Sequence, residues 1–212
     1  MKQKTYYHII LDQSGSMDDC VDSTISGFNE QLQVIQSLKE RFPDHELYIG
    51  LTRFNNEVMH TYYKENAFSI KKLNKKVYIP NGTTALYDAI GTTVLKLKDD
   101  IQAELDADIS AVVIVIITDG HENASRLFSF NGIRNLIKEL EGTGKWTFSY
   151  LGATIDAVDI AVNLNIKVQN SMSFEKAEMG ETYSKLKNSI NRYVDLRSKG
   201  EHTADFLTDD NP

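Results

Sequence analysis

Seven consecutive apolar residues, Ala111 to Ile117, form the longest apolar run in the chain, and most of them are β-branched. A run of this kind, with no alternating polar residues, is typical of a central parallel strand that is covered on both faces. The run is followed closely by Asp119. A second apolar run of strand length, Tyr6 to Leu11, leads directly into Asp12. The sequence therefore predicts two buried strands, each with an acidic residue at its carboxyl end.

Helical patterns separate most of the predicted strands. Apolar residues repeat at steps of three and four over residues 25–42, 86–105 and 133–140, which indicates amphipathic helices. A short helix is expected over 158–164 and a last one over 174–198. Strands that alternate with helices are typical of a three-layer α/β domain with a mostly parallel sheet.

One pair of strands breaks this alternation. Residues 46–54 and 57–63 both have strand composition, and they are so close in sequence that they must pair antiparallel as a hairpin at an edge of the sheet. The following segment, 64–79, is less regular, and we expect a short helix around Ile70 and Leu73. The six expected strands are residues 6–11, 46–54, 57–63, 111–117, 146–151 and 166–168.

Length and composition bound the remaining possibilities. The chain has 212 residues, which fits one domain over 1–198 followed by an acidic, poorly ordered tail over 199–212. Its single cysteine, Cys20, cannot form an internal disulfide, so we expect a reducing, cytoplasmic location. We find no signal peptide pattern and no apolar run of membrane-spanning length. The net charge of −7 argues against a general nucleic-acid binder.

Oxygen-bearing side chains follow the first strand at alternate positions, namely Asp12, Ser14 and Ser16. In a turn, such side chains can converge on one point. One carboxylate and two hydroxyls suit Mg²⁺, Mn²⁺ or Ca²⁺ and suit zinc poorly. If the strand order reverses between the two buried strands, Asp12 and Asp119 lie at the crevice where open α/β sheets bind ligands. The sequence therefore predicts one cation site at this edge of the sheet.

These residues resemble the von Willebrand factor A domain family and its metal-ion-dependent adhesion site. Residues 12–17 read D-Q-S-G-S-M and match the family pattern D-x-S-G-S-M, and residues 118–120 match its T-D-G. The family also has a threonine at the start of a helix, in the pattern G-G-T-x-x-x-x-A-L, and here Thr83 and Thr84 compete for that role. Counting back six residues from Ile90 selects Thr84.

The resemblance implies a Rossmann-like fold and a divalent cation that is held directly by Ser14, Ser16 and Thr84, with Asp12 and Asp119 acting partly through water. An open coordination position would accept a glutamate or aspartate of a partner protein. The implied function is thus a metal-dependent protein-binding module, neither an enzyme nor a membrane protein. The chain resembles the small single-domain members of bacteria and phages, and an adaptor role in an ATPase or stress-response complex is the alternative within this family.

The alternative function from another class, that of enzymes, is a magnesium-dependent phosphotransferase of the haloacid dehalogenase type, in which an aspartate also follows an apolar strand. Its pattern D-x-D-G-T requires a second acid where this chain has Ser14, and a serine is no general acid at neutral pH. A simpler alternative is that Asp12, Ser14 and Ser16 only cap the helix that follows. Tyr87 and His121 are expected on the rim of the site, because each closely follows a proposed ligand.

Overall fold

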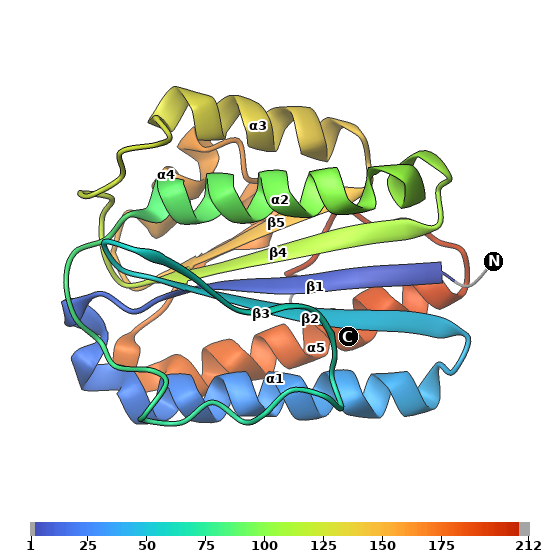
Figure 1. Ribbon diagram of the computed structural model, residues 1–212, viewed down its shortest axis with the longest axis horizontal. Helices are drawn as coiled ribbons and strands as arrows, with labels where there is room; N and C mark the ends of the chain where they lie inside the picture. The colour runs from blue at the N-terminus through green and yellow to red at the C-terminus, as the bar shows by residue number, and fades with distance from the viewer. Residues whose placement is uncertain (1–2, 208–212) are drawn as a thin grey trace.

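The computed structural model describes residues 3–207 and has a six-stranded sheet between two layers of helices (Figure 1). The strand order is β3-β2-β1-β4-β5-β6, and all neighbours are parallel except β2 and β3. The strands are β1 (Gln3–Asp12), β2 (His45–Phe54), β3 (Val58–Asn66), β4 (Ser110–Thr118), β5 (Trp146–Gly152) and β6 (Ser171–Ser173). The α-helices are α1 (Val21–Arg41), α2 (Leu86–Asp106), α3 (Phe130–Gly142), α4 (Ala157–Asn163) and α5 (Met179–Ser198). Short 3-10 helices are η1 (Gly15–Cys20), η2 (Val168–Asn170) and η3 (Lys176–Glu178).

Strands β1 and β4 lie side by side in the middle of the sheet. Ile10 pairs with Ile116 and Leu11 with Ile117 in a parallel register. Every residue of β4 is buried, as its unbroken apolar run predicts. The order of the strands reverses between β1 and β4, so the predicted crevice lies at the carboxyl ends of these two strands.

The two faces of the sheet bury separate apolar cores. Tyr7, Ile9 and Leu11 of β1 face α1 and α5, whereas Tyr6 and Ile10 face the layer that contains α2, α3 and α4. Figure 1 shows these two layers below and above the sheet. No helix among residues 3–207 is long and apolar enough to cross a membrane.

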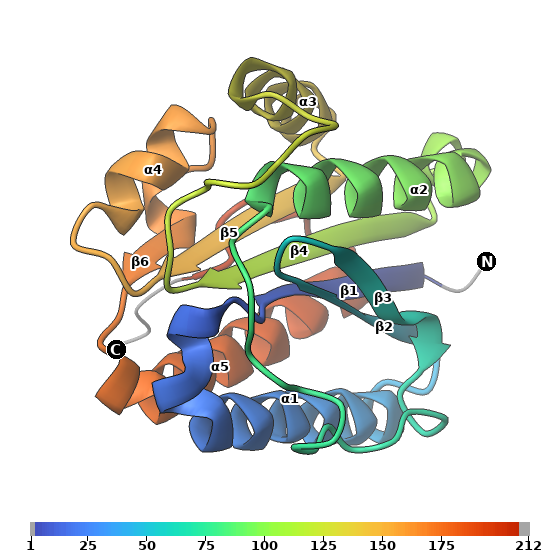
Figure 2. The same ribbon diagram turned by 60° about the vertical axis from the view of Figure 1, so that its left-hand side comes forward.

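The segment from β3 to α2 contains no helix, so the predicted short helix around Ile70 and Leu73 is wrong. Both side chains are nevertheless buried against the core on the α1 side. The side-chain amide of Asn29 in α1 bonds the backbone of Leu73 twice, accepting from its N–H at 2.8 Å and donating to its carbonyl at 3.0 Å. These bonds satisfy the backbone of Leu73 without a helix and tie the irregular segment to α1 (Figure 2).

The last strand lies five residues later than the 166–168 that the sequence predicts. Ile166 instead follows the end of α4, and its amide donates to the carbonyl of Ala161 in that helix at 2.9 Å. The residue before it, Asn165, has a positive φ of 64°. Helices often end in such a left-handed residue followed by a buried apolar one, which explains the apolar character of Ile166.

Phe206 belongs to the segment that we expected to be poorly ordered, yet its side chain is fully buried. Its ring lies 6.2 Å from the ring of Tyr7 and 6.0 Å from that of Tyr193, between centroids. Its amide donates a hydrogen bond of 2.6 Å to the side chain of the buried Asn170. Residues 208–212 lie outside the described part of the chain.

The two edges of the sheet are irregular or short. The pairing of β3 with β2 shifts register twice, between Ile49 and Leu51 and again between Leu51 and Thr52. At the opposite edge, β6 has only three residues.

Candidate metal site

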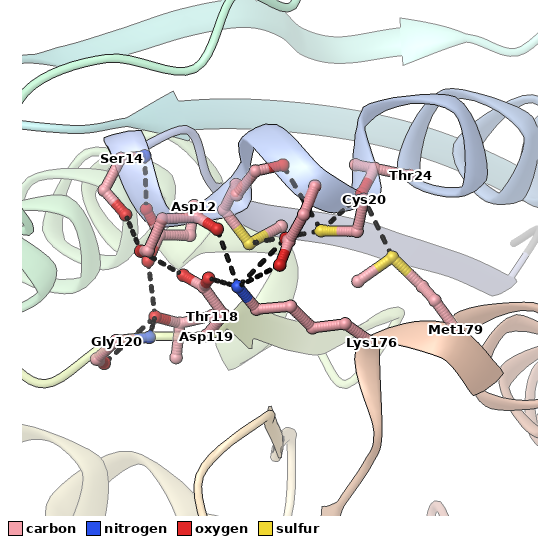
Figure 3. A network of polar contacts seen from close by, with 12 residues as sticks. Asp12, Ser14, Cys20, Thr24, Thr118, Asp119, Gly120, Lys176 and Met179 are labelled. Atoms are coloured by element: carbon pink, nitrogen blue, oxygen red, sulfur yellow. Dashed lines mark hydrogen bonds and ion pairs between the residues drawn. The ribbon is translucent and has the colours of Figure 1, made fainter.

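The five residues that the sequence predicts as ligands come from three loops at the carboxyl edge of β1 and β4. Asp12 ends β1, and Asp119 comes directly after β4. Ser14 and Ser16 follow Asp12 at the start of η1, and Thr84 precedes α2. Figure 3 shows the polar network around the ends of the two strands.

Asp12 is fully buried, and both of its carboxylate oxygens accept hydrogen bonds. Oδ1 accepts from the backbone N–H of Ser14 at 2.7 Å, and Oδ2 accepts from the hydroxyl of Thr118 at 2.5 Å. Burial raises the pKa of Asp12 to about 6, while the hydrogen bonds from Thr118 and Ser14 act in the opposite direction. Asp12 therefore fixes the first loop through Ser14 and ties β1 to β4 through Thr118.

A chain of hydroxyls joins the first loop to the end of β4. The hydroxyl oxygens of Ser14 and Ser16 lie 3.1 Å apart. Ser16 donates a hydrogen bond of 2.7 Å from its hydroxyl to Oδ1 of Asp119. Four of the five predicted residues thus form one connected group, although Ser16 and Asp119 are 103 positions apart in sequence.

Thr84 reaches the same place from the third loop. A Cβ atom added to Gly120 would lie 3.2 Å from Oγ1 of Thr84 and 3.8 Å from Oγ of Ser16, so both hydroxyls border this glycine. Asn123 holds Thr84 in position, since its side-chain oxygen accepts from the Thr84 amide at 2.9 Å and its own amide donates to the Thr84 carbonyl at 3.0 Å. Thr84 is buried and Thr83 is exposed, so the structure brings Thr84 and not Thr83 to the other hydroxyls.

Gly82 allows the third loop to approach the first. Its φ is +73°, and a Cβ atom there would collide with the side chain of Asn56. Its carbonyl accepts a hydrogen bond of 3.1 Å from the amide of Gly15, in the turn between Ser14 and Ser16. The loop before α2 and the loop after β1 are therefore fastened together next to the proposed ligands.

Lys176, in η3, is the residue at this site that sequence reasoning missed. Its ammonium nitrogen lies 2.6 Å from Oδ2 of Asp119, 3.0 Å from Oδ1 of Asp19 and 2.6 Å from the carbonyl oxygen of Ser16. It is one lysine in a segment predicted as helix, and no pattern in the sequence links it to Asp119. Thr118 was also missed as a partner of Asp12, although it stands in the T-D-G motif.

The two residues expected on the rim have different surroundings. The side chain of His121 is exposed, and its Nε2 lies 3.8 Å from Oδ1 of Asp156. Tyr87 is half-buried, its ring centroid lies 6.1 Å from that of Phe130, and its amide donates to Glu122 at 3.0 Å.

The donor set is rich in hydroxyls and contains two carboxylates. Within residues 3–207 there is no group of three or more histidine, cysteine, aspartate or glutamate side chains placed to hold a metal ion. Three hydroxyls with two carboxylates match the all-oxygen ligands that Mg²⁺, Mn²⁺ and Ca²⁺ prefer. The buried side chain of Asp119, which here pairs with an ammonium, also shows that the site accommodates positive charge.

Comparison with solved structures identifies several proteins with the same fold. The domain of the type V pili tip protein Mfa5 from Porphyromonas gingivalis is 11% identical with a TM-score of 0.65, over 92% of this chain and 97% of that one. Proximal thread matrix protein 1 from the mussel byssus is 16% identical with a TM-score of 0.57, over 92% of this chain and 46% of the mussel chain. This chain thus spans slightly less than half of the mussel protein. A further structure of that protein has a zinc-occupied MIDAS motif, that is, a metal-ion-dependent adhesion site with zinc bound. It is 13% identical with a TM-score of 0.52, over 93% of this chain and 46% of that one.

Sequence comparison adds the family. No curated protein sequence matches this chain. The family model for the von Willebrand factor type A domain matches residues 8–153, which is more than half of the chain and includes all five proposed ligands. Together with the six-stranded fold, this match shows that the chain belongs to the von Willebrand factor type A domain family.

Proposed function

We propose that this domain binds a divalent cation, Mg²⁺ or else Mn²⁺ or Ca²⁺, and through it an acidic residue of a partner protein. The proposed ligands are Asp12, Ser14, Ser16, Thr84 and Asp119. Domains of this family are typically adhesion or protein-binding modules and often have such a metal site. The mussel protein with a zinc-occupied MIDAS motif is one relative with a metal at this motif.

The observation that carries the proposal is the convergence of three hydroxyls from two loops. Oγ of Ser16 lies 3.1 Å from Oγ of Ser14, and both Ser16 and Thr84 border Gly120. Helix capping alone does not account for this arrangement, because Ser14 makes no side-chain cap bond at the start of η1 and the N-cap residue of α2 is Ala85, not Thr84. The hydroxyls of Ser14 and Ser16 instead contact each other and Asp119, which is the arrangement expected of side chains that share one cation.

The hydrogen bonds suggest how the ligands divide their roles. Both oxygens of Asp12 already accept bonds from the protein, so Asp12 is better suited to orient Ser14 and to act at longer range. The neutral hydroxyls are then the direct ligands, and they leave more positive charge on the cation than carboxylates would. Such a cation retains affinity for an anionic oxygen, which supports a glutamate or aspartate as the partner residue.

The metal half of the proposal is tested by calorimetric titration of metal-free protein with Mg²⁺ and with Mn²⁺. We expect one site per chain for the wild type and no measurable binding for Asp119→Ala. Heat without saturation, or equal binding by wild type and Asp119→Ala, would contradict this site.

The partner half is tested by affinity capture from an extract of the native organism. A true partner should be retained by the wild type in Mg²⁺ and lost both in EDTA and with Asp119→Ala. Substitution of one exposed glutamate or aspartate of that partner by alanine should abolish binding, because the metal would then lose its anionic ligand. A partner that binds equally in Mg²⁺ and EDTA would show that the binding surface lies elsewhere.

The phosphotransferase alternative is not favoured by any observation at the site. Its general acid would have to stand at Ser14, whose hydroxyl instead lies 3.1 Å from that of Ser16. We expect no hydrolysis of an aryl phosphate in the presence of Mg²⁺. Turnover that requires Mg²⁺ and disappears in Asp12→Asn would overturn the binding-module proposal.

A further inference from the structure

The metal-binding loops already hold a cation of the protein's own, the ammonium group of Lys176 (Figure 3). Its nitrogen lies 2.6 Å from Oδ2 of Asp119 and 2.6 Å from the carbonyl oxygen of Ser16. Both of these residues are proposed metal ligands. Lys176 comes from η3, between β6 and α5, and so reaches the site from outside the three loops that supply those ligands.

The contact between Lys176 and Asp119 is not an ordinary surface ion pair. The side chain of Asp119 is 0% exposed, whereas exposed pairs such as Lys75 and Asp22 leave 67% and 79% of their side chains exposed. The other oxygen of Asp119 accepts from the hydroxyl of Ser16. A buried carboxylate is costly unless a positive charge lies beside it, and Lys176 provides that charge.

A divalent cation that used Ser16 and Asp119 would share their immediate surroundings with this ammonium. Two positive charges that contact the same carboxylate repel each other strongly at a partly buried site. The ammonium also has a second acidic partner, because Oδ1 of Asp19 lies 3.0 Å from its nitrogen and the side chain of Asp19 is 66% exposed. Lys176 could therefore keep its pair with Asp19 while giving up Asp119.

We infer that Lys176 competes with the divalent cation for Asp119 and thereby sets the metal affinity of the site. This inference rests on the proposed function and adds to it a residue outside the metal-binding motifs. The competition has two consequences. Removal of the ammonium strengthens metal binding, and it also destabilises the metal-free protein, because the buried Asp119 then has no neighbouring positive charge.

The test compares four proteins in calorimetric titrations with Mn²⁺ and with Mg²⁺. Lys176→Met removes the charge and keeps an unbranched apolar stem, and Lys176→Arg keeps the charge. Lys98→Met is the matched control, since Lys98 is also partly exposed and also pairs with a carboxylate, that of Glu139 at 2.9 Å, but it lies on α2. We expect Lys176→Met to bind the metal about ten- to a hundredfold more tightly than wild type. Lys176→Arg and Lys98→Met should remain within about threefold of wild type.

Thermal unfolding provides a second readout that needs no bound metal. In EDTA, Lys176→Met should melt below both wild type and Lys98→Met, and saturating Mg²⁺ should remove most of that difference. Lys176→Gln, a second neutral replacement, should behave as Lys176→Met does, which guards against an effect of the methionine itself.

The outcomes separate the inference from the proposed function. If wild type and Lys176→Met both bind metal with equal affinity, or Lys176→Met binds more weakly, the competition is disproved and the metal site stands. If no variant binds a divalent cation, both proposals fail. Tighter binding by Lys176→Arg than by wild type would also contradict the inference, because the charge would then not be the cause.

Discussion

The hydroxyl of Thr118 donates a hydrogen bond of 2.5 Å to Oδ2 of Asp12, across the two neighbouring strands at the centre of the sheet. Thr118 also contacts the loop that follows it, because its hydroxyl oxygen accepts from the amide of Gly120 at 3.2 Å. One side chain thus joins the first proposed ligand to the loop that carries Asp119. Thr118 and Asp12 are both buried, so water cannot replace the hydrogen bond between them at low cost.

Thr118→Val should therefore destabilise the metal-free domain by about 1–3 kcal/mol, because it keeps the shape of the side chain and leaves a buried carboxylate oxygen without its donor. Urea unfolding at pH 7.5 in EDTA measures this change. Thr118→Ser retains the hydroxyl and should lose much less. A loss in Thr118→Ser as large as that in Thr118→Val would contradict the prediction, because serine keeps the hydroxyl and removes only the methyl group.

Thr84 and Thr83 offer a matched pair for testing the third loop. A ligand in hundredfold excess over its Kd stabilises the native state by about 2.7 kcal/mol, which for a domain of this size raises the Tm by about 5–11 °C. Thr84→Ala should remove about 3–6 °C of the rise produced by Mg²⁺, since a tenfold loss of affinity corresponds to about 1.4 kcal/mol. Thr83→Ala should leave the rise unchanged, because Thr83 is exposed and does not belong to the cluster of proposed ligand hydroxyls. The reverse pattern would show that the neighbouring threonine is the ligand.

A buried histidine on β1 should make the domain sensitive to acid. Burial, together with the nearby charge of His60, lowers the pKa of His8 from 6.5 to about 3. The ring nitrogen Nε2 of His8 lies 2.8 Å from the hydroxyl of Thr52, which in turn lies 2.9 Å from Nδ1 of His60 and accepts from Thr93 at 3.0 Å. The Thr52 oxygen has two lone pairs and Thr93 donates to one of them, so it can accept from only one protonated ring, and the other ring must remain neutral and accept the Thr52 proton.

Because the folded pKa of His8 is lower than its unfolded value, the unfolded chain takes up the proton first as the pH falls. The stability that depends on neutral His8 is complete above about pH 6.5 and decreases toward pH 3, by about 2 kcal/mol at pH 5. Urea unfolding in EDTA at pH 7.5 and pH 5 should show this loss in wild type and in the control His202→Gln, in which an exposed histidine is replaced. In His8→Gln the loss should be clearly smaller, and an unchanged loss would assign the acid sensitivity to other groups.

The end of the described chain should contribute strongly to stability. Phe206→Ala removes a fully buried ring that packs between Tyr7 and Tyr193, and such truncations cost about 3–5 kcal/mol. Since single domains are stable by about 5–15 kcal/mol, a large part of the total should be lost. Val168→Ala, at a residue that is 59% exposed, is the control and should change the urea midpoint very little. A Phe206→Ala midpoint equal to that of wild type would mean that this segment is not packed on the domain in solution.

The positions of Asp12 and Asp119 could be predicted because they follow from two buried strands and one reversal of strand order. Each strand is a run of apolar residues, and parallel strands bring their carboxyl ends to one edge. The choice of Thr84 over Thr83 depended on the family pattern, which places the threonine six residues before an apolar residue such as Ile90, and the burial of Thr84 agrees with it. Local patterns place these residues because each proposed ligand lies close to the end of a regular element.

Lys176 could not be predicted in the same way. It follows β6, whose three residues have no strand pattern of their own, and the apolar Ile166 that suggested a strand lies just after α4 and bonds back to it. Likewise, Ile70 and Leu73 are apolar because they pack on α1, although the backbone between them is not helical. In both cases the structure depends on contacts with distant residues, such as Asn29 and Asp119, which leave no periodic signal along the chain.

The irregular edges of the sheet have a consequence for how this protein behaves at high concentration. An exposed, straight edge strand is a template on which a second chain can add its own strand, and repeated addition leads to fibrils. The two register shifts along β3 interrupt the even row of amide and carbonyl groups that such growth requires, and the three residues of β6 are too few to start it. The central strand β4, which by composition is the most prone to aggregate, lies three strands from one edge and two from the other and is sheltered from both.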